Sequence, residues 1–298
     1  MKCTITSFNN NRIKETATLL KQAKARREQD AFVAEGIRMC REIPKGRLLC
    51  LYLSEELASR IGGGISETDP ALSDLISYAR SKGEGYLEVV KQDVFERLAD
   101  TRSPQGILAV VKCFHYEEAD LMGSAKQATS HSQQDQTGRI GKGAKAPLIL
   151  ALENLQDPGN LGTMFRSGEA AGVTGILMSN DTVDVYNPKV IRSTMGSIFR
   201  IPFYYTEDFI GSIRALKEHG VRTYAAHLKG TGSYETCDYT GPSAFLIGNE
   251  GNGLTKEAAD SADTYIKIPM EGQLESLNAA TAATVLLFEA ARQRRQKP

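Results

Sequence analysis

The sequence predicts an α/β protein with two domains, a small N-terminal one and a larger C-terminal one built on a parallel sheet with helices on both faces. Three observations support this prediction. Short apolar runs alternate with helical patterns, residues 123–147 interrupt that alternation, and 298 residues are more than one ordinary domain contains. The expected boundaries are residues 1–115 for the first domain, 116–147 for a flexible linker and 148–298 for the second domain.

The first domain is expected to be a small unit of alternating strands and helices. Ile13, Ala17 and Leu20 recur near helical spacing with Lys and Arg on the other faces, so residues 12–28 are predicted to form one helix. Short apolar runs bounded by glycine or polar residues predict the strands. The remaining expected elements are strands at 32–36, 48–53, 86–90 and 107–111, and helices at 55–61, 71–82 and 92–99.

Residues 123–147 differ in composition from both flanking domains. Ile140 is their only large apolar residue, so the segment cannot bury enough surface to offset the entropy lost on ordering. Four basic residues against the single acid Asp135 give it a net charge of +3. We therefore expect a flexible interdomain tether, which could also contact a polyanion.

The second domain is expected to contain the parallel sheet. Its predicted strands are 148–152, 175–178, 201–205, 221–227, 245–247 and 265–268, and its predicted helices are 161–172, 188–196, 208–219, 255–262 and 277–295. The strands at 245–247 and 265–268 both end in polar, glycine-containing loops. In open α/β sheets the edge at the strand carboxyl ends is where ligands bind, so we expect the functional site there.

Whole-chain composition excludes several protein classes. Hydrophobic residues at 41% and charged residues at 24% are typical of a globular protein, and no apolar run is long enough to span a membrane. The N-terminus lacks the apolar region of a secretory signal. Five cysteines without CxxC spacing and four scattered histidines favour a reducing, cytoplasmic location and predict neither a disulfide framework nor a metal site.

The formal net charge of zero conceals a local asymmetry. Residues 1–47 hold eleven Lys and Arg residues against five acids, a net charge of +6. Such a basic region on a neutral chain suggests contact with a polyanion such as nucleic acid. A solvated helix face would give the same count, so charge alone leaves both interpretations open.

The first stretch that could carry chemistry runs from Asn154 to Arg166. Asn160 is placed to cap a helix that begins near Leu161. At about 100° per residue, Leu161 and Phe165 share a stripe toward the core, whereas Arg166 points about 140° away from it. Arg166 is therefore either ordinary surface charge or a group aimed into a cleft, and composition alone favours the surface.

The second stretch is Gly248-Asn249-Glu250-Gly251-Asn252-Gly253, directly after the strand at 245–247. It is not the GxGxxG fingerprint of dinucleotide-binding folds, and no Gly-Lys-Ser/Thr follows it as in a P-loop. Three glycines at a strand end permit the backbone to approach a ligand closely. A plain glycine-rich turn, with Glu250 as a helix-start acid, is the alternative.

The third stretch runs from Ile268 to Asn278. Ser276 is a good helix N-cap, and Asn278 would lie in the first turn of the terminal helix. Capping alone would account for both residues. It does not explain why Glu250, Ser276 and Asn278 should converge on one sheet edge with Arg166.

Together these stretches resemble the SpoU (TrmH-like) family of RNA ribose 2′-O-methyltransferases over residues from about 148 to 298. The resemblance rests on three ordered motifs, Asn160-x-Gly162-x-x-x-Arg166, Ile247-Gly248-Asn249-Glu250-Gly251-x-Gly253-Leu254 and Ile268-Pro269-Met270-x-Gly272-x-x-x-Ser276-Leu277-Asn278. The first domain looks like that family's substrate-binding domain, which is similar in fold to kink-turn-binding ribosomal proteins; the residues concerned are Phe32-Val33-Ala34-Glu35-Gly36-Ile37-Arg38 and Ser103-Pro104-Gln105-Gly106. Ala279-Ala280 and the long linker depart from the family pattern.

The resemblance implies a C-terminal trefoil knot, S-adenosylmethionine as methyl donor and a homodimer built through the C-terminal domain. It implies a cofactor site made by residues whose backbone or side chains match the family's: Gly248, Ile268, Leu277, Ile247 and Met270. The polar catalytic set that it implies is Arg166, Asn160, Glu250, Ser276 and Asn278.

The implied reaction moves a methyl group from a sulfonium to a ribose 2′-hydroxyl, with ribosomal RNA of the 23S type as the expected substrate, and needs no metal. Arg166 matches the residue proposed in the family as the base. Because free arginine is essentially always protonated, a bidentate grip on a neighbouring phosphate is the other role. The alternatives to the whole interpretation are a tRNA methyltransferase, a non-catalytic RNA-binding protein and, weakest, a nucleotide-dependent oxidoreductase.

Overall fold

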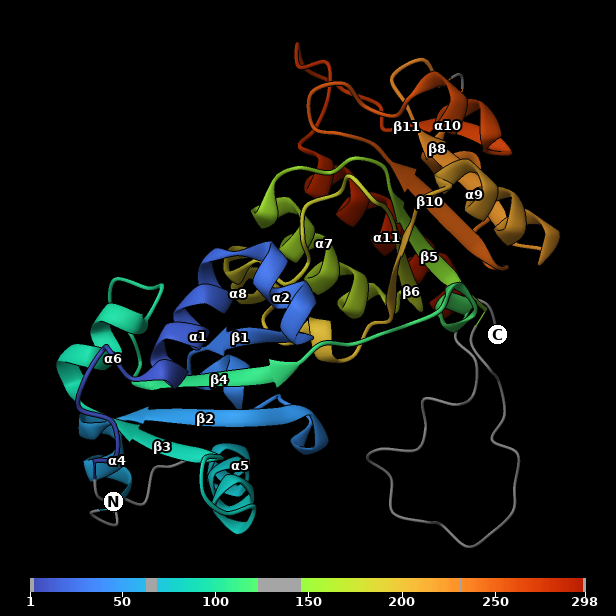
Figure 1. Cartoon of the computed structure of the whole chain (residues 1–298). Coiled ribbons are helices and arrows are strands. Elements are labelled where there is room, and N and C mark those ends of the chain that lie inside the picture. Colours follow the sequence, from blue (N-terminus) through green and yellow to red (C-terminus); the bar gives the residue numbers. More distant parts are fainter. Residues whose placement is uncertain (1–2, 63–68, 123–145, 231, 297–298) are drawn as a thin grey trace, which may run out of the picture. The chain divides into compact units, whose positions relative to one another are not determined.

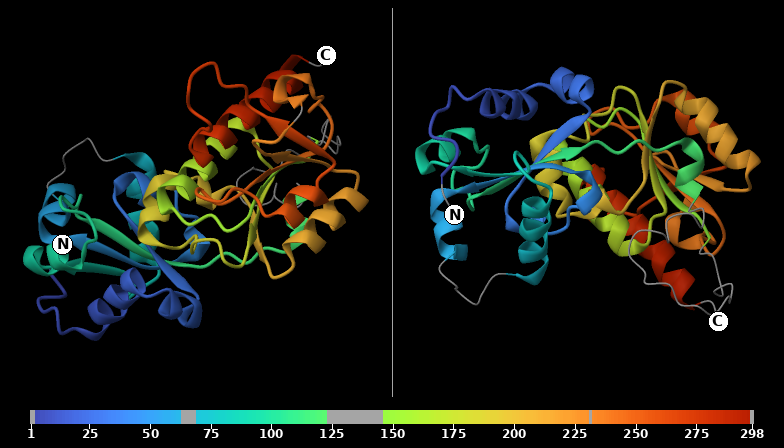
Figure 2. Two further views of the ribbon diagram at one scale, coloured as in Figure 1. Left: turned by 90° about the horizontal axis from the view of Figure 1, so that it is seen from above. Right: turned by 60° about the horizontal axis from the view of Figure 1, so that its bottom comes forward.

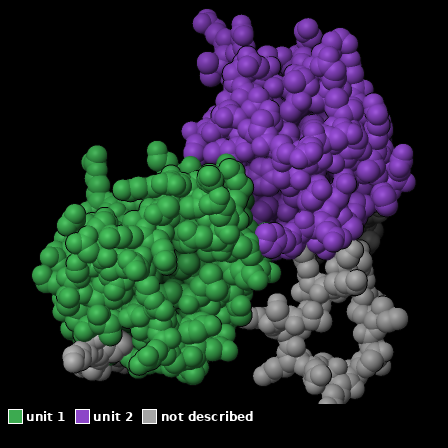
Figure 3. Space-filling model, in the orientation of Figure 1, with its two compact units in different colours: residues 1–114, 184–199 green, residues 115–183, 200–298 purple. Residues whose placement is uncertain are grey.

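The computed structural model describes residues 3–62, 69–122, 146–230 and 232–296 (Figure 1). Its contacts divide the chain into two compact units (Figure 3). Unit 1 comprises Met1–Phe114 and Asp184–Phe199, and unit 2 comprises His115–Val183 and Arg200–Pro298. Most of the expected linker, residues 123–145, lies outside the described residues.

Unit 1 is built on a four-stranded sheet in the order β1-β4-β2-β3 (Figure 1). The strands are β1 (Ala31–Glu35), β2 (Leu48–Ser54), β3 (Leu87–Val90) and β4 (Ile107–Lys112). Strand β4 runs antiparallel to both β1 and β2, and β3 is parallel to β2. The helices are α1 (Asn11–Lys21), α2 (Ala23–Gln29), α3 (Ile37–Cys40), α4 (Glu55–Gly62), α5 (Pro70–Ser81) and α6 (Gln92–Leu98).

The prediction of one helix over residues 12–28 is wrong, because the helix breaks at Gln22. The backbone there is extended, with φ −123° and ψ 116°, and separates α1 from α2. The break turns Arg26 inward, where its side chain is 5% exposed. Its Nη1 donates to the Leu19 carbonyl at 2.7 Å, and its Nε and Nη2 donate to Asp184 Oδ2 at 2.9 and 2.6 Å. The hydrophobic periodicity predicted one continuous helix because such a pattern places every Lys and Arg on the solvent-facing side. It therefore could not anticipate that Arg26 is buried.

A segment from the second half of the chain completes unit 1. Residues 184–199, with α8 (Pro188–Thr194), pack against β1. The Tyr186 ring stacks on Phe32 with 4.7 Å between centroids. Its hydroxyl accepts the Phe114 N–H at 2.6 Å and donates to the Phe114 carbonyl at 3.0 Å. The expected domain of residues 148–298 therefore differs from unit 2, because residues 184–199 pack into unit 1. An apolar pattern in the sequence does not reveal which core a segment joins.

Unit 2 is built on a seven-stranded sheet in the order β7-β6-β5-β10-β8-β11-β9. The strands are β5 (Leu148–Leu152), β6 (Gly175–Ser179), β7 (Phe203–Thr206), β8 (Arg222–Ala226), β9 (Gly232–Ser233), β10 (Ser243–Ile247) and β11 (Thr264–Lys267). Every paired strand runs parallel to its neighbour, as expected. After β5 the chain adds β6 and β7 toward one edge of the sheet, and the later strands β8 to β11 form the other half. The strand order therefore switches between β5 and β10.

Helices cover both faces of this sheet (Figure 2). They are α7 (Pro158–Ala171), α9 (Phe209–Glu218), α10 (Lys256–Ser261) and α11 (Ala279–Gln296). Helices α9 and α10 share a core with Ala244 and Leu246 of β10, whereas α7 packs on α11, which contacts β10. None of the helices in the described part of the chain has the length and apolarity needed to cross a membrane.

Residues 116–122, expected to belong to the flexible linker, instead pack into unit 2. Leu121 is fully buried in the same core as Ile149 and Leu177. Its carbonyl accepts the Thr174 hydroxyl at 2.8 Å. A Cβ at Gly175 would lie 2.6 Å from the Leu121 Cα, so the close approach depends on that glycine. The linker prediction is therefore wrong for these seven residues, because the compositional change begins after them.

Candidate active site

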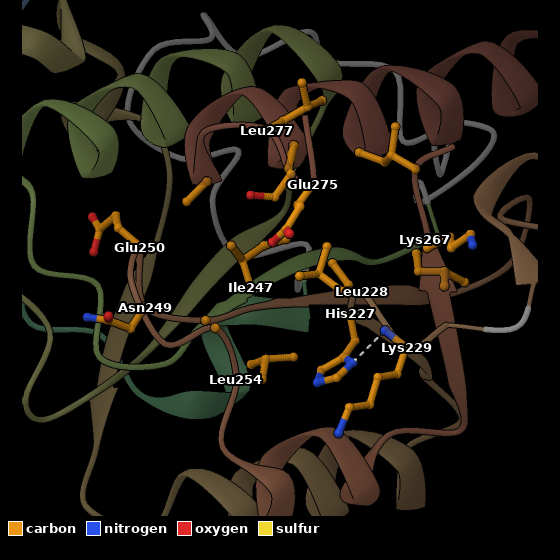
Figure 4. Close-up of a pocket in the computed structure, with 18 of the residues that line it drawn as sticks. His227, Leu228, Lys229, Ile247, Asn249, Glu250, Leu254, Lys267, Glu275 and Leu277 are labelled. Atoms are coloured by element: carbon orange, nitrogen blue, oxygen red, sulfur yellow. Dashed lines mark hydrogen bonds between the residues drawn. The ribbon is translucent and has the colours of Figure 1, made fainter. Parts of the chain in front are cut away.

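Loops at the carboxyl end of the unit 2 sheet line a cavity of about 710 Å³ (Figure 4). They follow the neighbouring strands β8, β10 and β11, and the segment that leads into α11 completes the lining. The walls combine polar and apolar groups, and the apolar part includes Ile247, Leu254, Ile266, Ile268, Leu277 and Leu286. The cavity lies beside the switch in strand order, where open α/β sheets bind their ligands. Its volume and its apolar walls suit a small-molecule ligand.

The sequence-predicted cofactor residues all line this one cavity: Gly248, Ile268, Leu277, Ile247 and Met270. Two members of the predicted polar set, Glu250 and Ser276, line it as well. Glu250 lies on the glycine loop at one side of the cavity, and Lys229 and Lys267 lie at the other side (Figure 4). Within the described residues, no group of three or more His, Cys, Asp or Glu side chains is placed to hold a metal ion.

The glycine loop after β10 folds tightly on itself. The Asn249 N–H donates to the Gly253 carbonyl at 3.0 Å, and the Gly253 N–H returns to Asn249 O at 2.9 Å. A Cβ at Gly248 would lie 2.1 Å from the backbone of both Gly253 and Leu254. The sequence suggested that this glycine admits a ligand. The structure shows that it admits the loop's own backbone, which then forms part of the cavity wall.

Asn249 was not predicted to matter, yet its side chain organises the loop. Its Oδ1 accepts the N–H groups of Gly251 at 2.9 Å and Asn252 at 3.1 Å. Its Nδ2 donates to the Asn154 carbonyl at 2.8 Å, which ties the glycine loop to the loop after β5. An asparagine in a glycine-containing loop directly after a strand is typical of such side-chain turns, so the signal was present in the sequence.

Helix α7 begins three residues earlier than expected, and Asp157 rather than Asn160 caps it. Asp157 Oδ1 accepts the Asn160 N–H at 2.8 Å, and Pro158 occupies the first helical position, where proline is favoured. The capping role predicted for Asn160 is therefore wrong. Its side chain is left for other contacts. Its Nδ2 donates to Glu250 Oε1 at 3.0 Å, and its Oδ1 accepts Asn278 Nδ2 at 2.9 Å.

The cap of the terminal helix also differs from the prediction. Helix α11 begins at Ala279, and Asn278 Oδ1 accepts the N–H groups of Ala280 at 2.9 Å and Thr281 at 3.2 Å. Asn278 is thus the N-cap, and the prediction that Ser276 caps this helix is wrong. Ser276 is exposed at the cavity, and its side chain makes no hydrogen bond to any other described residue.

Asn160, Glu250 and Asn278 therefore form one hydrogen-bonded chain that joins all three motif stretches. The Glu250 carboxylate also accepts the N–H groups of Gln156 at 3.1 Å and Asp157 at 2.9 Å. Partial burial opposes ionisation of Glu250, but these hydrogen bonds, led by that from Asn160, outweigh it and lower its pKa below the usual value. An ionised Glu250 fixes the orientation of the Asn160 amide.

Arg166 lies on α7, six residues beyond Asn160, which places it about 9 Å farther along the helix axis. The predicted core stripe is buried, since Leu161, Phe165 and Gly168 are all inaccessible, and Arg166 is exposed. Its guanidinium has neither an ion pair nor a hydrogen bond with any described residue. The structure thus leaves Arg166 available to an external anion and does not join it to the chain of Asn160, Glu250 and Asn278.

We expect Glu250→Gln to destabilise the protein at neutral pH and much less in acid. A lowered carboxyl pKa contributes stability that is present above the unfolded value of about 4.5 and is lost as the pH falls through the folded pKa. Urea unfolding at pH 7 and pH 3 measures the free-energy difference from the unaltered protein. Glu257→Gln, at an exposed carboxyl on α10, is the control and should change little at either pH. An equal loss for Glu250→Gln at both pH values would contradict this explanation.

Comparison with known proteins gives matches over both units. The SpoU rRNA Methylase family matches residues 147–288, and an MRM3-like substrate binding domain matches residues 10–109. The 23S rRNA (guanosine(2553)-2'-O)-methyltransferase RlmP of Bacillus subtilis is 32% identical over 67% of this chain and 70% of its own length. The chain belongs to the SpoU rRNA methylase family. The resemblance read from the three motifs is thereby confirmed.

Other relatives of this SpoU-family protein cover more of its length. The 23S rRNA (guanosine-2'-O-)-methyltransferase RlmB of Shewanella oneidensis is 31% identical over 76% of this chain and 86% of its own. A crystal structure of an AdoMet-bound rRNA methyltransferase from Sinorhizobium meliloti is 30% identical, with a TM-score of 0.77 over 97% of each chain. The similarity to solved structures of this family confirms the expected α/β trefoil-knot class of the fold.

Proposed function

We propose that this SpoU-family protein transfers a methyl group from S-adenosylmethionine to a ribose 2′-hydroxyl of ribosomal RNA. The observation that carries the proposal is the meeting of the three motif stretches, where Asn160, Glu250 and Asn278 are hydrogen-bonded beside an apolar cavity at the strand ends. RlmP and RlmB, two relatives at 31–32% identity, are named for this reaction on 23S rRNA. Family membership and the site geometry therefore support the same activity.

The chemistry of the cavity fits S-adenosylmethionine. A volume of about 710 Å³ is ample for an adenosyl group with its amino-acid tail, and walls such as Ile247 and Leu254 suit an adenine ring. Gly248 and Ile268 lie at strand ends, where backbone N–H and C=O groups can bond the edge of the base. Rim charges on Lys229 and Glu275 suit the charged tail. When bound, the cofactor would supply an electrophilic methyl group on sulfur.

The protein's own polar residues would hold the ribose. We assign Arg166 to a bidentate grip on a phosphate next to the target nucleotide, because its guanidinium is exposed, is unpaired among the described residues and presents the forked donors that match a phosphate. Asn160 is oriented by Glu250 on one side and Asn278 on the other, which leaves one of its amide hydrogens for a ribose oxygen. Holding the hydroxyl in line with the methyl group supplies much of the rate acceleration of such a transfer.

Labelled S-adenosylmethionine tests the activity directly. We expect methyl transfer to ribosomal RNA from a strain that lacks the protein, at a 2′-oxygen that mapping by ribose-methylation sequencing identifies. Transfer to tRNA alone would favour the tRNA methyltransferase alternative. Failure to bind either S-adenosylmethionine or S-adenosylhomocysteine in calorimetry would overturn the proposal and favour a non-catalytic RNA-binding protein.

We also propose that the protein is a homodimer through unit 2 and is cytoplasmic. Phe288 on α11 is 42% exposed, a large apolar group that a second copy could cover. All five cysteines are free, which suits the reducing cytoplasm. Light scattering should give twice the chain mass of 32.5 kDa, and a mass of one chain would rule out the dimer. Recovery with membranes on cell fractionation would contradict the location.

A further inference from the structure

Unit 1 contains a cavity of its own, of about 220 Å³, which shares no residue with the cavity of unit 2. It lies between α1, the end of α2 and strands β1, β2 and β4. Its floor consists of buried residues: Thr16, Leu19, Ala31, Cys50, Tyr52 and Val110. Its rim consists of Arg12, Glu15, Gln29 and Leu49, all exposed. The floor therefore combines apolar side chains with the Thr16 and Tyr52 hydroxyls, which bond each other at 3.2 Å, and ligand pockets commonly pair apolar walls with a few such polar groups.

A β-bulge places Leu49 at the lip of this cavity. Strand β4 pairs consecutive residues with Leu48 and Cys50 of β2, so Leu49 between them has no partner in the ladder. Leu49 is 41% exposed, whereas every other residue of β2 is buried. Bulges redirect a side chain and are frequent beside functional sites. Here the bulge presents an apolar surface to whatever enters the cavity.

A fixed cation stands at the mouth of the same cavity. Arg12 Nη1 donates to the Gly85 carbonyl at 3.0 Å and to Glu88 Oε1 at 2.7 Å. A Cβ at Gly85 would lie 2.3 Å from Arg12 Nη2, so any side chain at residue 85 would displace the guanidinium from this place. The Arg12 side chain is thus already ordered before a ligand arrives, which lowers the entropy lost on binding.

We propose that this cavity receives one unpaired base of the RNA substrate, with Leu49 against the face of the base and Arg12 beside its phosphate. The inference rests on the proposed function, which makes RNA the substrate. The flanking helices α1 and α2 expose further cations at Lys14, Lys21, Lys24 and Arg27. Bases outside a duplex are held between aromatic or apolar side chains, while cations neutralise the backbone phosphates. The cavity lies within the part of the chain that matches a substrate binding domain.

Two RNA duplexes test the inference in the full chain, one fully paired and one with a single unpaired adenosine. Fluorescence anisotropy should show the unaltered protein binding the second RNA about tenfold more tightly. Leu49→Asp should reduce the preference to less than about twofold, because a carboxylate would face the base and its phosphate. Ser81→Asp adds the same charge at an exposed position at the end of α5, a helix that does not line the cavity, and should keep the preference.

Methyl-transfer kinetics separate this inference from the proposed function. Leu49→Asp should raise the KM for ribosomal RNA about tenfold and leave kcat and the affinity for S-adenosylmethionine unchanged. The inference is overturned if the unaltered protein shows no preference for the unpaired base, or if Leu49→Asp retains it. A preference that Leu49→Asp abolishes, in a protein that transfers no methyl group, would uphold the cavity and reject the activity. Should Leu49→Asp fail to fold, Leu49→Ser carries the same test.

Discussion

Arg166→Ala is expected to slow methyl transfer to RNA at least about a thousandfold while leaving the melting temperature and the affinity for S-adenosylmethionine unchanged. Arg166 is exposed and has no partner among the described residues, so its removal breaks no contact within the fold. The substitution should therefore change only the steps of the reaction in which RNA takes part. Arg166→Lys should recover little, because an ammonium cannot make two parallel hydrogen bonds to a phosphate. Single-turnover transfer of a labelled methyl group and calorimetry measure the two quantities.

Arg214→Ala is the matched control for this prediction. Arg214 is an exposed arginine on α9 of the same unit, also without a partner among the described residues, and we expect its variant to retain full activity. Full activity in Arg166→Ala would remove the role assigned to it. Loss of S-adenosylmethionine binding in that variant would place Arg166 at the cofactor instead of at the RNA.

Gly248→Ala is expected to weaken S-adenosylmethionine binding at least about a hundredfold and to destabilise the protein by about 1–3 kcal/mol. The added Cβ would lie 2.1 Å from the Gly253 carbonyl carbon and the Leu254 nitrogen. Both atoms belong to the backbone, so no change of rotamer relieves the overlap and the loop must open. Opening would break the hydrogen bonds between Asn249 and Gly253 and move one wall of the cavity. Calorimetry and thermal unfolding check the two effects.

Gly251→Ala in the same loop is the control. Its Cβ would meet only Asn249 Oδ1 at 3.5 Å, an ordinary contact, so we expect affinity within about threefold of the unaltered protein. If the two alanine variants weaken binding equally, the backbone overlap at Gly248 is not the cause. Unchanged binding in Gly248→Ala would mean that this loop does not form part of the cofactor site.

The strands and the order of the motifs could be predicted from sequence because they depend on local patterns. Strand β5 has the predicted bounds of 148–152, and the core stripe of α7 carries the predicted Leu161 and Phe165. Both follow from burial periodicity, which depends only on near neighbours along the chain. The sheet edge that holds the site follows from the same information, since parallel strands share one carboxyl end.

The errors occur where several residues compete for one role. Asp157 and Asn160 are both good caps, and the structure uses Asp157 because proline follows it at the first helical position. Ser276 and Asn278 compete in the same way, and Asn278 caps α11 while also bonding Asn160. The second contact joins residues 118 positions apart in the chain. Propensity scales contain no such distant contact, so the hydrogen-bonded chain could not be foreseen in detail.

Because residues 184–199 belong to unit 1, they affect how unit 1 can be exchanged between related proteins. The chain passes from one unit to the other after Phe114, after Val183 and after Phe199, so a single cut cannot separate them. A hybrid that transplanted residues 1–114 alone would leave the buried Arg26 guanidinium without the carboxylate of Asp184. An unpaired buried charge of this kind costs about 3–5 kcal/mol. A working chimaera should therefore take residues 1–114 and residues 184–199 from the same parent protein.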